Sequence, residues 1–255
     1  MSDLSVVIVT QNEEDRIRRC LDSVSWAGEI VVVDAFSTDG TVDICKSYTE
    51  KIYSRAWDGF IPQKNYALTL ATKEWVLCLD ADEQLSDALI EEIKTVTGRD
   101  GGDCAAYSMP RKTLYLGRWM EHSGWYPDRK VRLMRRGAGV WAGLEPHDVL
   151  EVKGRVCALR GDILHYSFRD LSHHVRKLDY FTDAASSELV RSGGHPGVMD
   201  MITHPAGMFL KMFIVKAGFR DGVQGFIAAV VSAFHVFCKY SKAWETEKVK
   251  ARVRA

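Results

Sequence analysis

Three short runs of apolar, largely β-branched residues stand out in the first eighty positions of the chain. They cover residues 4–10 (LSVVIVT), 29–34 (EIVVVD) and 75–79 (WVLCL). Uninterrupted apolar runs of this length are typical of strands covered on both faces of a parallel sheet. The segments between them carry apolar residues at three- and four-residue spacing or open with turn residues, which predicts helices. We expect helices over about 14–27, from 41 onward, over 63–71 and over 86–96, with a short strand at 51–54.

The pattern changes after residue 104. Short alternating runs rich in aromatic residues and arginine occur at 107–109, 131–134 and 149–152, and they predict antiparallel strands appended to the parallel sheet. The last third is helical, with helices expected over 170–190, about 205–219 and 224–240. Together the patterns predict an α/β fold with a mixed, doubly wound sheet and a C-terminal helical extension, with the clearest boundary near 192–196.

Composition narrows the function classes. Apolar residues make up 46% of the chain and charged residues 27%, which is ordinary for a folded protein with a real core. Lysine plus arginine and aspartate plus glutamate number 34 each, which argues against a protein held to nucleic acid by a general positive field. We therefore expect no nucleic-acid partner.

Cysteine usage and the N-terminus bear on the compartment. The six cysteines lie far apart, without a CxxC pair or the spacing of a zinc site, so we expect reduced, mostly buried thiols. The chain runs from Met1 directly into a strand-like stretch and shows no signal-peptide pattern. A cytoplasmic location is the expectation.

Acidic residues follow two of the predicted buried strands. Asp80 and Asp82 come directly after the third apolar run, while Asp34 ends the second and Asp39 follows in a turn. Ligands of open α/β sheets bind at the carboxyl ends of strands, and such carboxylates suit Mg²⁺ or Mn²⁺ bound together with a diphosphate. Two alternatives stay open: an acidic loop capping the helix that begins near Ser86, and Asp39 as a helix N-cap before Thr41.

The order and spacing of several motifs resemble those of the inverting glycosyltransferases of family 2, which have the GT-A fold. The motifs are VVIVTQNEE at 6–14, VVVDAFSTDGT at 31–41, QKNYAL at 63–68, WVLCLDADE at 75–83 and LEPHDVL at 144–150. The resemblance covers about residues 2–170 and is most similar to the lipopolysaccharide-core glucosyltransferase branch. It implies a catalytic domain over 1–192, with a nucleotide-binding half at 1–103 and an acceptor half at 104–170, followed by an extension over 193–255.

The resemblance also implies a donor site for a nucleotide-diphosphate sugar. Asp82 would ligate the metal, Asp80 would contact the ribose or a metal-bound water, and Lys64 would lie near the donor phosphates, although an exposed helix lysine is the alternative. The full set implied to bind the nucleotide sugar is Thr10, Asn12, Glu13, Asp34, Ser37, Asp39, Lys64, Asp80 and Ala81.

Inverting transfer needs a base that takes a proton from the acceptor hydroxyl. The candidate is Asp148, although the family more often has His-Glu here, and a loop aspartate held by backbone amides is the alternative. His147 and His165 are further candidates for orienting the base or contacting the metal or acceptor. Arg132 belongs to a basic cluster (Arg129, Lys130, Arg132, Arg135, Arg136) that would meet a phosphorylated acceptor or be only solvated. His173 and His174 are expected to be solvated.

The C-terminal segment 225–238 is apolar on nearly every side but covers only about fourteen residues, fewer than the roughly 20 that span a bilayer. Flanking cations (Lys211, Lys216, Arg220, Lys239, Lys242) favour helices at an anionic membrane surface or in a homodimer. A helical cap packed on the catalytic domain is the alternative.

The resemblance therefore implies transfer of a hexose such as glucose, from a UDP-linked donor, to a lipopolysaccharide-core or other lipid-linked glycan. The enzyme would work at the inner face of the cytoplasmic membrane. Two rivals remain: a nucleotidyltransferase, which would usually carry a glycine-rich loop where residues 10–13 have no glycine, and a catalytically silent sugar-nucleotide-binding or membrane scaffold protein.

Overall fold

The structure of the protein is a computed structural model that describes residues 2–98, 102–144 and 147–250. The chain divides into two units: Met1–Lys112 with Pro127–Tyr166, and Thr113–Tyr126 with Ser167–Ala255. This division does not follow the boundary expected near 192–196, because the helix before that point groups with the helices after it. The roles given to the predicted domains stay predictions.

The main sheet of the first unit begins with four parallel strands in the order β3-β2-β1-β4. The three apolar runs form β1, β2 and β4, as predicted, and every residue of β2 is buried. Helices connect the strands, so the predicted alternation is confirmed. These elements are β1 (Leu4–Thr10), α1 (Ile17–Val24), β2 (Glu29–Asp34), α2 (Thr41–Lys46), β3 (Ile52–Ser54), α3 (Phe60–Leu70), β4 (Trp75–Asp80) and α4 (Asp87–Gly98).

The sheet continues on the other side of β4 with antiparallel neighbours. Strand β8 (Asp128–Arg135) pairs with β4, and β6 (Cys104–Tyr115) pairs with β8. The order then runs to β12 (Ile163–His165) and β5 (Glu83–Leu85), a short strand that the sequence pattern did not predict. Two further strands pair with β6, namely β7 (Arg118–Trp119) and β11 (Arg155–Ala158).

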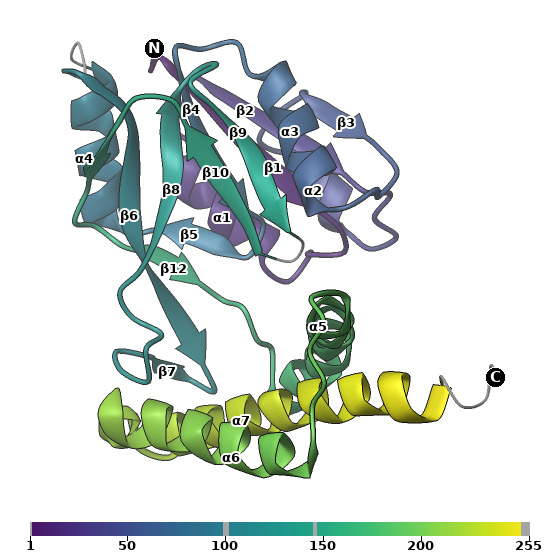
Figure 1. Cartoon of the computed structure of the whole chain (residues 1–255). Coiled ribbons are helices and arrows are strands. Elements are labelled where there is room, and N and C mark those ends of the chain that lie inside the picture. Colours follow the sequence, from purple (N-terminus) through teal and green to yellow (C-terminus); the bar gives the residue numbers. More distant parts are fainter. Residues whose placement is uncertain (1, 99–101, 145–146, 251–255) are drawn as a thin grey trace. The chain divides into compact units, whose positions relative to one another are not determined.

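Strands β9 (Gly139–Leu144) and β10 (His147–Val152) form a separate antiparallel pair. The expectation that residues 149–152 extend the main sheet is therefore wrong. Trp141 and Leu150 instead pack into the apolar cluster that contains Val31 and Cys78 of the main sheet. This pair lies over one face of the sheet beside α3 (Figure 1). An alternating pattern fixes which side chains point inward, but not which surface receives them.

Alternation along the buried strands builds a core on each face of the sheet. Leu4, Val6 and Ile8 of β1 pack with α1, α2 and α4, whereas Val7 packs with α3 and the β9–β10 pair. Figure 1 shows α1 and α4 behind the sheet and α3 in front. Burial on both faces explains why these strands read as unbroken apolar runs.

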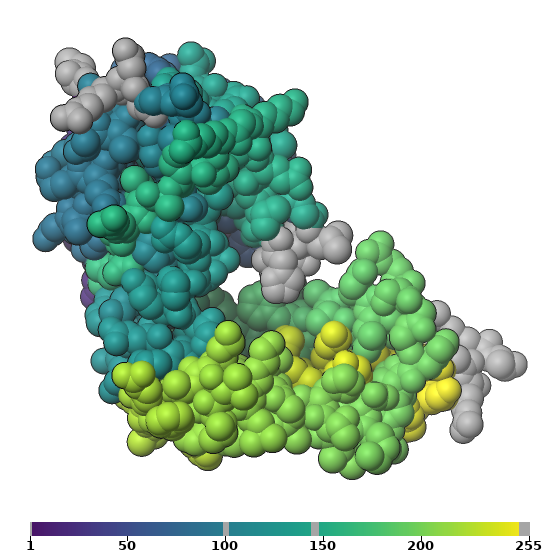
Figure 2. Space-filling model, turned by 60° about the vertical axis from the view of Figure 1, so that its left-hand side comes forward, coloured from purple at the N-terminus to yellow at the C-terminus, as the bar shows by residue number. Residues whose placement is uncertain are grey.

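The second unit is built on α5 (Leu171–Arg191), α6 (Val198–Leu210) and α7 (Gly222–Trp244). A π-helical turn (Lys211–Val215) and a 3₁₀ turn (Gly218–Asp221) connect α6 to α7, and a π-helical segment (Glu245–Lys250) follows α7. Helices α6 and α7 pack side by side, as the adjacent green and yellow surfaces of Figure 2 show. Helix α6 begins earlier than predicted because it continues through Pro205.

The C-terminal helices are longer than the apolar run suggested. The helical stretches Val198–Val215 and Gly218–Val249 are both long and apolar enough to cross a membrane by length and composition, with mean hydropathies of 1.3 and 1.4. The sequence predicted that the C-terminal segment is too short to span a bilayer, because its apolar run covers only about fourteen residues. The helices extend beyond that run, so this argument from length is wrong. Length and composition alone are weak evidence for spanning.

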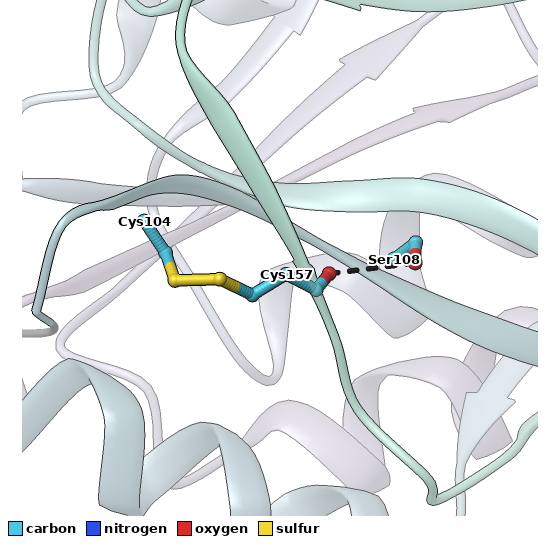
Figure 3. The surroundings of a disulfide bond; sticks show 3 residues. All are labelled: Cys104, Ser108 and Cys157. Atoms are coloured by element: carbon cyan, nitrogen blue, oxygen red, sulfur yellow. Dashed lines mark hydrogen bonds between the residues drawn. A yellow bond between two sulfur atoms is a disulfide. The ribbon is translucent and has the colours of Figure 1, made fainter.

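Cys104 and Cys157 form a disulfide that links β6 to β11 (Figure 3). The prediction of six reduced thiols is therefore wrong for this pair, while Cys20, Cys45, Cys78 and Cys238 are free. The two residues are 53 positions apart, and they meet only because β11 pairs in parallel with β6. Their spacing in the sequence carries no sign of that pairing.

A buried carboxylate joins the start of the parallel strands. Glu29 is only 6% exposed and accepts hydrogen bonds from Ser5, Lys51 and both the amide and the hydroxyl of Thr72. Burial raises its pKa, but the hydrogen bonds from Lys51, Ser5 and Thr72 outweigh burial and lower the pKa to about 2. Because the folded pKa lies below the usual 4.5, the stabilisation is present above pH 4.5 and is lost as the pH falls towards 2.

Replacing Glu29 by glutamine should lower the free energy of unfolding by about 2 kcal/mol at pH 7, since hydrogen bonds to a charged group are lost. The difference from the wild type should shrink at pH 3. Urea unfolding at both pH values measures it, with Glu50→Gln, at an exposed position, as the matched control. An equal loss at both pH values would mean that the charge of Glu29 is not what stabilises the strands.

Candidate active site

The strand register brings acidic residues to one edge of the sheet. Thr10 lies opposite Asp34 in the β1–β2 pair, and Val9 lies opposite Asp80 in the β1–β4 pair. The carboxyl ends of β1, β2 and β4 therefore meet, with Asp82 two residues beyond Asp80. This is the position at which open α/β sheets bind ligands.

Two loops at this edge hold each other in place. The amide of Asn12 donates to Ser37 Oγ at 2.8 Å, and the amide of Thr38 donates to Asn12 Oδ1 at 2.8 Å. Asp34 accepts from the amide of Ser37 at 2.9 Å and from its hydroxyl at 2.5 Å. The amide of Glu13 donates to Thr41 Oγ1 at 2.8 Å. The structure thus brings these predicted nucleotide-binding residues together.

Asp39 is not the N-cap of α2, which is Gly40, but it lies one residue before that cap and bonds to the first turn. Its carboxylate accepts from the amide of Thr41 at 3.0 Å, at the start of α2, and from the amide of Glu14 at 3.2 Å.

The same loop contains Phe36, to which the sequence motifs gave no role. It is 61% exposed with a φ of 57°, a backbone conformation uncommon outside glycine. The loop thus presents an aromatic ring to solvent two residues after Asp34.

Asp80 is held between two cations. Lys64 Nζ lies 2.9 Å from Asp80 Oδ1, and Arg132 Nη2 lies 2.7 Å from Asp80 Oδ2. Burial raises the pKa of Asp80, but Arg132 and then Lys64 lower it well below its usual value. Lys64 itself is only 8% exposed, so the alternative of an exposed helix lysine is wrong. The ionised aspartate is tolerated here because two partners neutralise it.

Arg132 is buried and paired with carboxylates, although the sequence predicted that its basic cluster meets a phosphorylated acceptor or is only solvated. Arg132 is 4% exposed, and its Nη2 also lies 2.9 Å from Glu83 Oε1. Glu83 Oε2 accepts a hydrogen bond from the amide of Asp80 at 3.0 Å. Arg132 Nε and Nη1 have no hydrogen-bond partner among the described residues. Buried donors of this kind are rare without a partner, and they offer hydrogen bonds to an anion.

The rest of the predicted basic cluster does not gather around Arg132. Arg129 donates to the carbonyl of Leu159 at 2.6 Å, Lys130 pairs with Asp128, and Arg135 pairs with Glu74. The register of the β6–β8 ladder shifts at Arg132, because Val131 and Leu133 lie opposite the consecutive residues Ser108 and Tyr107, and this cluster in the sequence does not become a cluster in space.

Asp82 lies in a second charged group beside the first. Its Oδ2 is 3.5 Å from His165 Nε2 and 3.4 Å from Arg16 Nη1. Burial raises the pKa of Asp82, but His165 and, more weakly, Arg16 lower it, to about 2. His165 arrives here because it pairs with Glu83 in the β12–β5 ladder. Arg16 lies outside the sequence motifs, and Glu83 ends the motif at 75–83 but was given no role by it.

Asp148 reaches the same group from β10. Its Oδ2 lies 2.9 Å from Lys64 Nζ, and Lys64 also lies over the ring of Trp141 at 4.4 Å from its centroid. Asn65 exchanges two hydrogen bonds of 2.9 Å with the backbone of Trp141, which ties α3 to β9. Asp148 is thus a strand residue in an ion pair, not a loop aspartate held by amides. The structure does not describe the side chain of His147, so its predicted role stays a prediction. Residues 145–146 also lie outside the described residues.

The donor set fits a metal only in part. Within residues 2–98, 102–144 and 147–250, no group of three or more His, Cys, Asp or Glu side chains is arranged to hold a metal ion. Asp80 is engaged by Lys64 and Arg132, whereas Asp82 and His165 offer an oxygen and a nitrogen close together. Mg²⁺ commonly takes one or two protein carboxylates and completes its shell with water and phosphate oxygens. The residues present therefore fit a metal that a bound diphosphate completes.

Comparison with known proteins agrees with this geometry. Residues 5–148 match the model of the family described as Glycosyl transferase family 2. The chain is 30% identical to the uncharacterized glycosyltransferase RT0209 of Rickettsia typhi, over 96% of this chain and 88% of that one. It is 28% identical to the lipopolysaccharide core biosynthesis glycosyltransferase LpsC of Rhizobium meliloti, over 98% and 94%.

A solved structure supports the fold. The mannosyltransferase PcManGT of Pyrobaculum calidifontis, crystallised with GDP-Man and Mn²⁺, superposes with a TM-score of 0.57 over 97% of this chain and 88% of that one, at 14% identity. The expected GT-A fold is confirmed. With its family model matched over more than half of its length, this chain belongs to glycosyl transferase family 2.

Proposed function

We propose that this glycosyltransferase is an inverting enzyme that transfers a hexose from a UDP-linked donor to a lipid-linked glycan, with Asp148 as the catalytic base. One observation carries the proposal: Lys64 Nζ lies 2.9 Å from both Asp80 and Asp148. The ammonium group of Lys64 thus joins Asp80, at the edge of the sheet where the donor is proposed to bind, to Asp148, the candidate base. Family 2 membership favours glycosyl transfer over the nucleotidyltransferase alternative.

The donor is proposed to bind along the carboxyl ends of β1, β2 and β4. Asp34 and the loops around Asn12 and Ser37 would receive the base and ribose, with the backbone interlocked in advance of binding. Thr10 Oγ1 is buried without a hydrogen-bond partner in the described structure, which supports contact with a ligand. The diphosphate would lie near Lys64 and Arg132.

Diphosphate binding would also change the partner of the base. Asp148 is paired with Lys64, so Oδ2 of its carboxylate is already engaged before a donor binds. A diphosphate would compete for Lys64 and free Asp148 to take the acceptor proton while the acceptor oxygen attacks the anomeric carbon. The bond to the diphosphate breaks on the opposite face, and Lys64 and Arg132 stabilise the charge left on the phosphate.

Asp82 and His165 are the proposed ligands of a divalent cation, Mg²⁺ or Mn²⁺. Such a metal supplies positive charge for the departing diphosphate. Arg16 Nη1 lies 3.4 Å from the same oxygen, Oδ2 of Asp82, and the backbone amide of Tyr166 donates to the carbonyl of Asp82 at 2.9 Å. These contacts position the carboxylate before any metal binds.

The proposed acceptor and location rest on the helical unit and on one relative. LpsC is described as a lipopolysaccharide core biosynthesis enzyme, and an acceptor of that class is carried on lipid. Apolar side chains on α6, the turn after it and α7 are open to solvent, among them Val215 (74% exposed), Met199 (67%) and Ile202 (58%). We propose that they contact the inner face of the cytoplasmic membrane, as an alternative to a dimer interface.

Asp82→Asn should make UDP binding at least about tenfold weaker in the presence of Mn²⁺, which corresponds to about 1.4 kcal/mol. Titration calorimetry with and without Mn²⁺ measures it. The control is Asp58→Asn, because Asp58 is an exposed partner of Arg55. Unchanged manganese dependence in the Asp82 variant would move the metal to other ligands.

Asp148→Asn should lower kcat by about 10² to 10⁴, the range of general base catalysis, while UDP binding stays within a small factor of the wild type. Single-turnover transfer and calorimetry separate the two quantities. Asp43→Asn, which changes an exposed carboxylate on α2, serves as the matched control. Near-normal transfer by the Asp148 variant would place the base elsewhere.

Substituting Ile202→Glu together with Val215→Glu should release the protein from anionic vesicles, since charge replaces apolar side chains at the proposed contact. Co-sedimentation with vesicles containing phosphatidylglycerol provides the readout. Val140→Glu, at an exposed valine of β9, controls for a general effect of acidic substitution. Retained sedimentation of the double variant would leave dimerisation as the role of this surface.

A further inference from the structure

The helical unit contains a cavity of about 540 Å³. It is partly open to solvent and is lined by residues of α5 and α7, by the segment from α6 to Lys216, by Phe168 and by residues 123–125, all of which belong to the second unit. Pockets that bind small molecules commonly have volumes of about 300–1,000 Å³. The family model ends at residue 148, before most of these elements begin.

The wall of the cavity is mainly apolar and aromatic. The rings of Trp125 and Phe168 are tilted against each other at a centroid distance of 6.1 Å, and Leu178 and Met212 are each only 7% exposed. Val231 contributes from α7. The apolar part of this wall suits a hydrocarbon chain, and the polar side chains that also line the cavity are Ser123, His174, Lys211, Lys216, Ser232 and His235.

Positive charge gathers where the cavity meets solvent. Lys211 and Lys216 both line it and are exposed, in contrast to the buried Leu178 and Met212. Neither lysine forms an ion pair in the part of the chain that the structure describes, and the lining residues include no aspartate or glutamate. The opening therefore complements an anionic group attached to an apolar chain.

His174 and Ser123 are polar residues in the wall of the cavity. His174 was expected to be solvated, but its Nδ1 lies 2.9 Å from the hydroxyl of Tyr115 and its ring lies 4.1 Å from that of Phe168. Burial, and more weakly Lys177, lowers the pKa of His174 to about 4, so its imidazole is neutral at physiological pH. Ser123 is 3% exposed, lines the cavity, and its Oγ has no hydrogen-bond partner in the described residues.

We infer that this cavity binds one acyl chain of an anionic phospholipid, with the phosphate group held by Lys211 and Lys216 at its opening. The occupant is a membrane lipid because the outer side chains of the same helices, such as Ile202 and Val215, are apolar and exposed. The inference rests on the proposed membrane contact for its source of lipid. It extends that contact from a surface to a specific site.

Dodecyl phosphate, used below its micelle concentration, is a soluble probe of this site. Calorimetry on the full chain should give saturable binding with one site, and Val231→Trp should weaken it at least about tenfold by filling the space of the chain. Val230→Trp is the matched control, because Val230 is the adjacent residue of α7, is 42% exposed and does not line the cavity. Circular dichroism checks that both variants fold.

The charge at the opening is tested separately. Lys211→Gln with Lys216→Gln should weaken dodecyl phosphate binding about tenfold or more, whereas weak binding of dodecyl maltoside, which has no charge, should not change. Lys239→Gln with Lys248→Gln removes the same charge from other positions of the unit, neither of which lines the cavity.

Three outcomes would overturn the inference: no binding of dodecyl phosphate to the folded wild type, equal binding by the two tryptophan variants, or equally tight binding of inorganic phosphate. Because the probes are monomeric, failure here is distinct from failure to bind vesicles or to transfer sugar.

Discussion

The candidate active site depends on buried carboxylates that are tolerable only as members of a charge network. Asp80 ends a strand covered on both faces and stays ionised because Lys64 and Arg132 contact opposite oxygens of its carboxylate. Removing either partner would leave the carboxylate of Asp80, which is partly buried, with less compensating charge. The network also fixes geometry, since Lys64 connects Asp80 on β4 with Asp148 on β10, two strands that are not paired with each other.

Much of this arrangement could be predicted from the sequence where the signal is local. Unbroken apolar runs located the parallel strands, and the carboxyl ends of those strands placed Asp34, Asp80 and Asp82 at one edge. The partners of these residues could not be predicted in the same way. Arg132 and His165 reach the edge through antiparallel pairings formed by segments far along the chain, and no periodicity encodes which strands will meet.

Polar residues in the helical unit show a second limit of sequence patterns. His174 lies among hydrophilic neighbours in the sequence, yet it contacts Tyr115 and Phe168, which come from outside α5. Helical periodicity describes the faces of one helix, and the surroundings of each face come from other elements. The apolar cavity and the exposed apolar helix surfaces therefore emerge only when the elements are assembled.

The disulfide between β6 and β11 joins residues 53 positions apart and closes a covalent ring that includes Arg132, Trp141 and Asp148. In the chain-entropy description, such a ring removes freedom from the unfolded state equivalent to roughly 4 kcal/mol. Cytosolic thiols are ordinarily kept reduced, so in that compartment the ring would be open and its segments held by strand pairing alone. The disulfide thus tethers the segment that carries the proposed base only where the two thiols are oxidised.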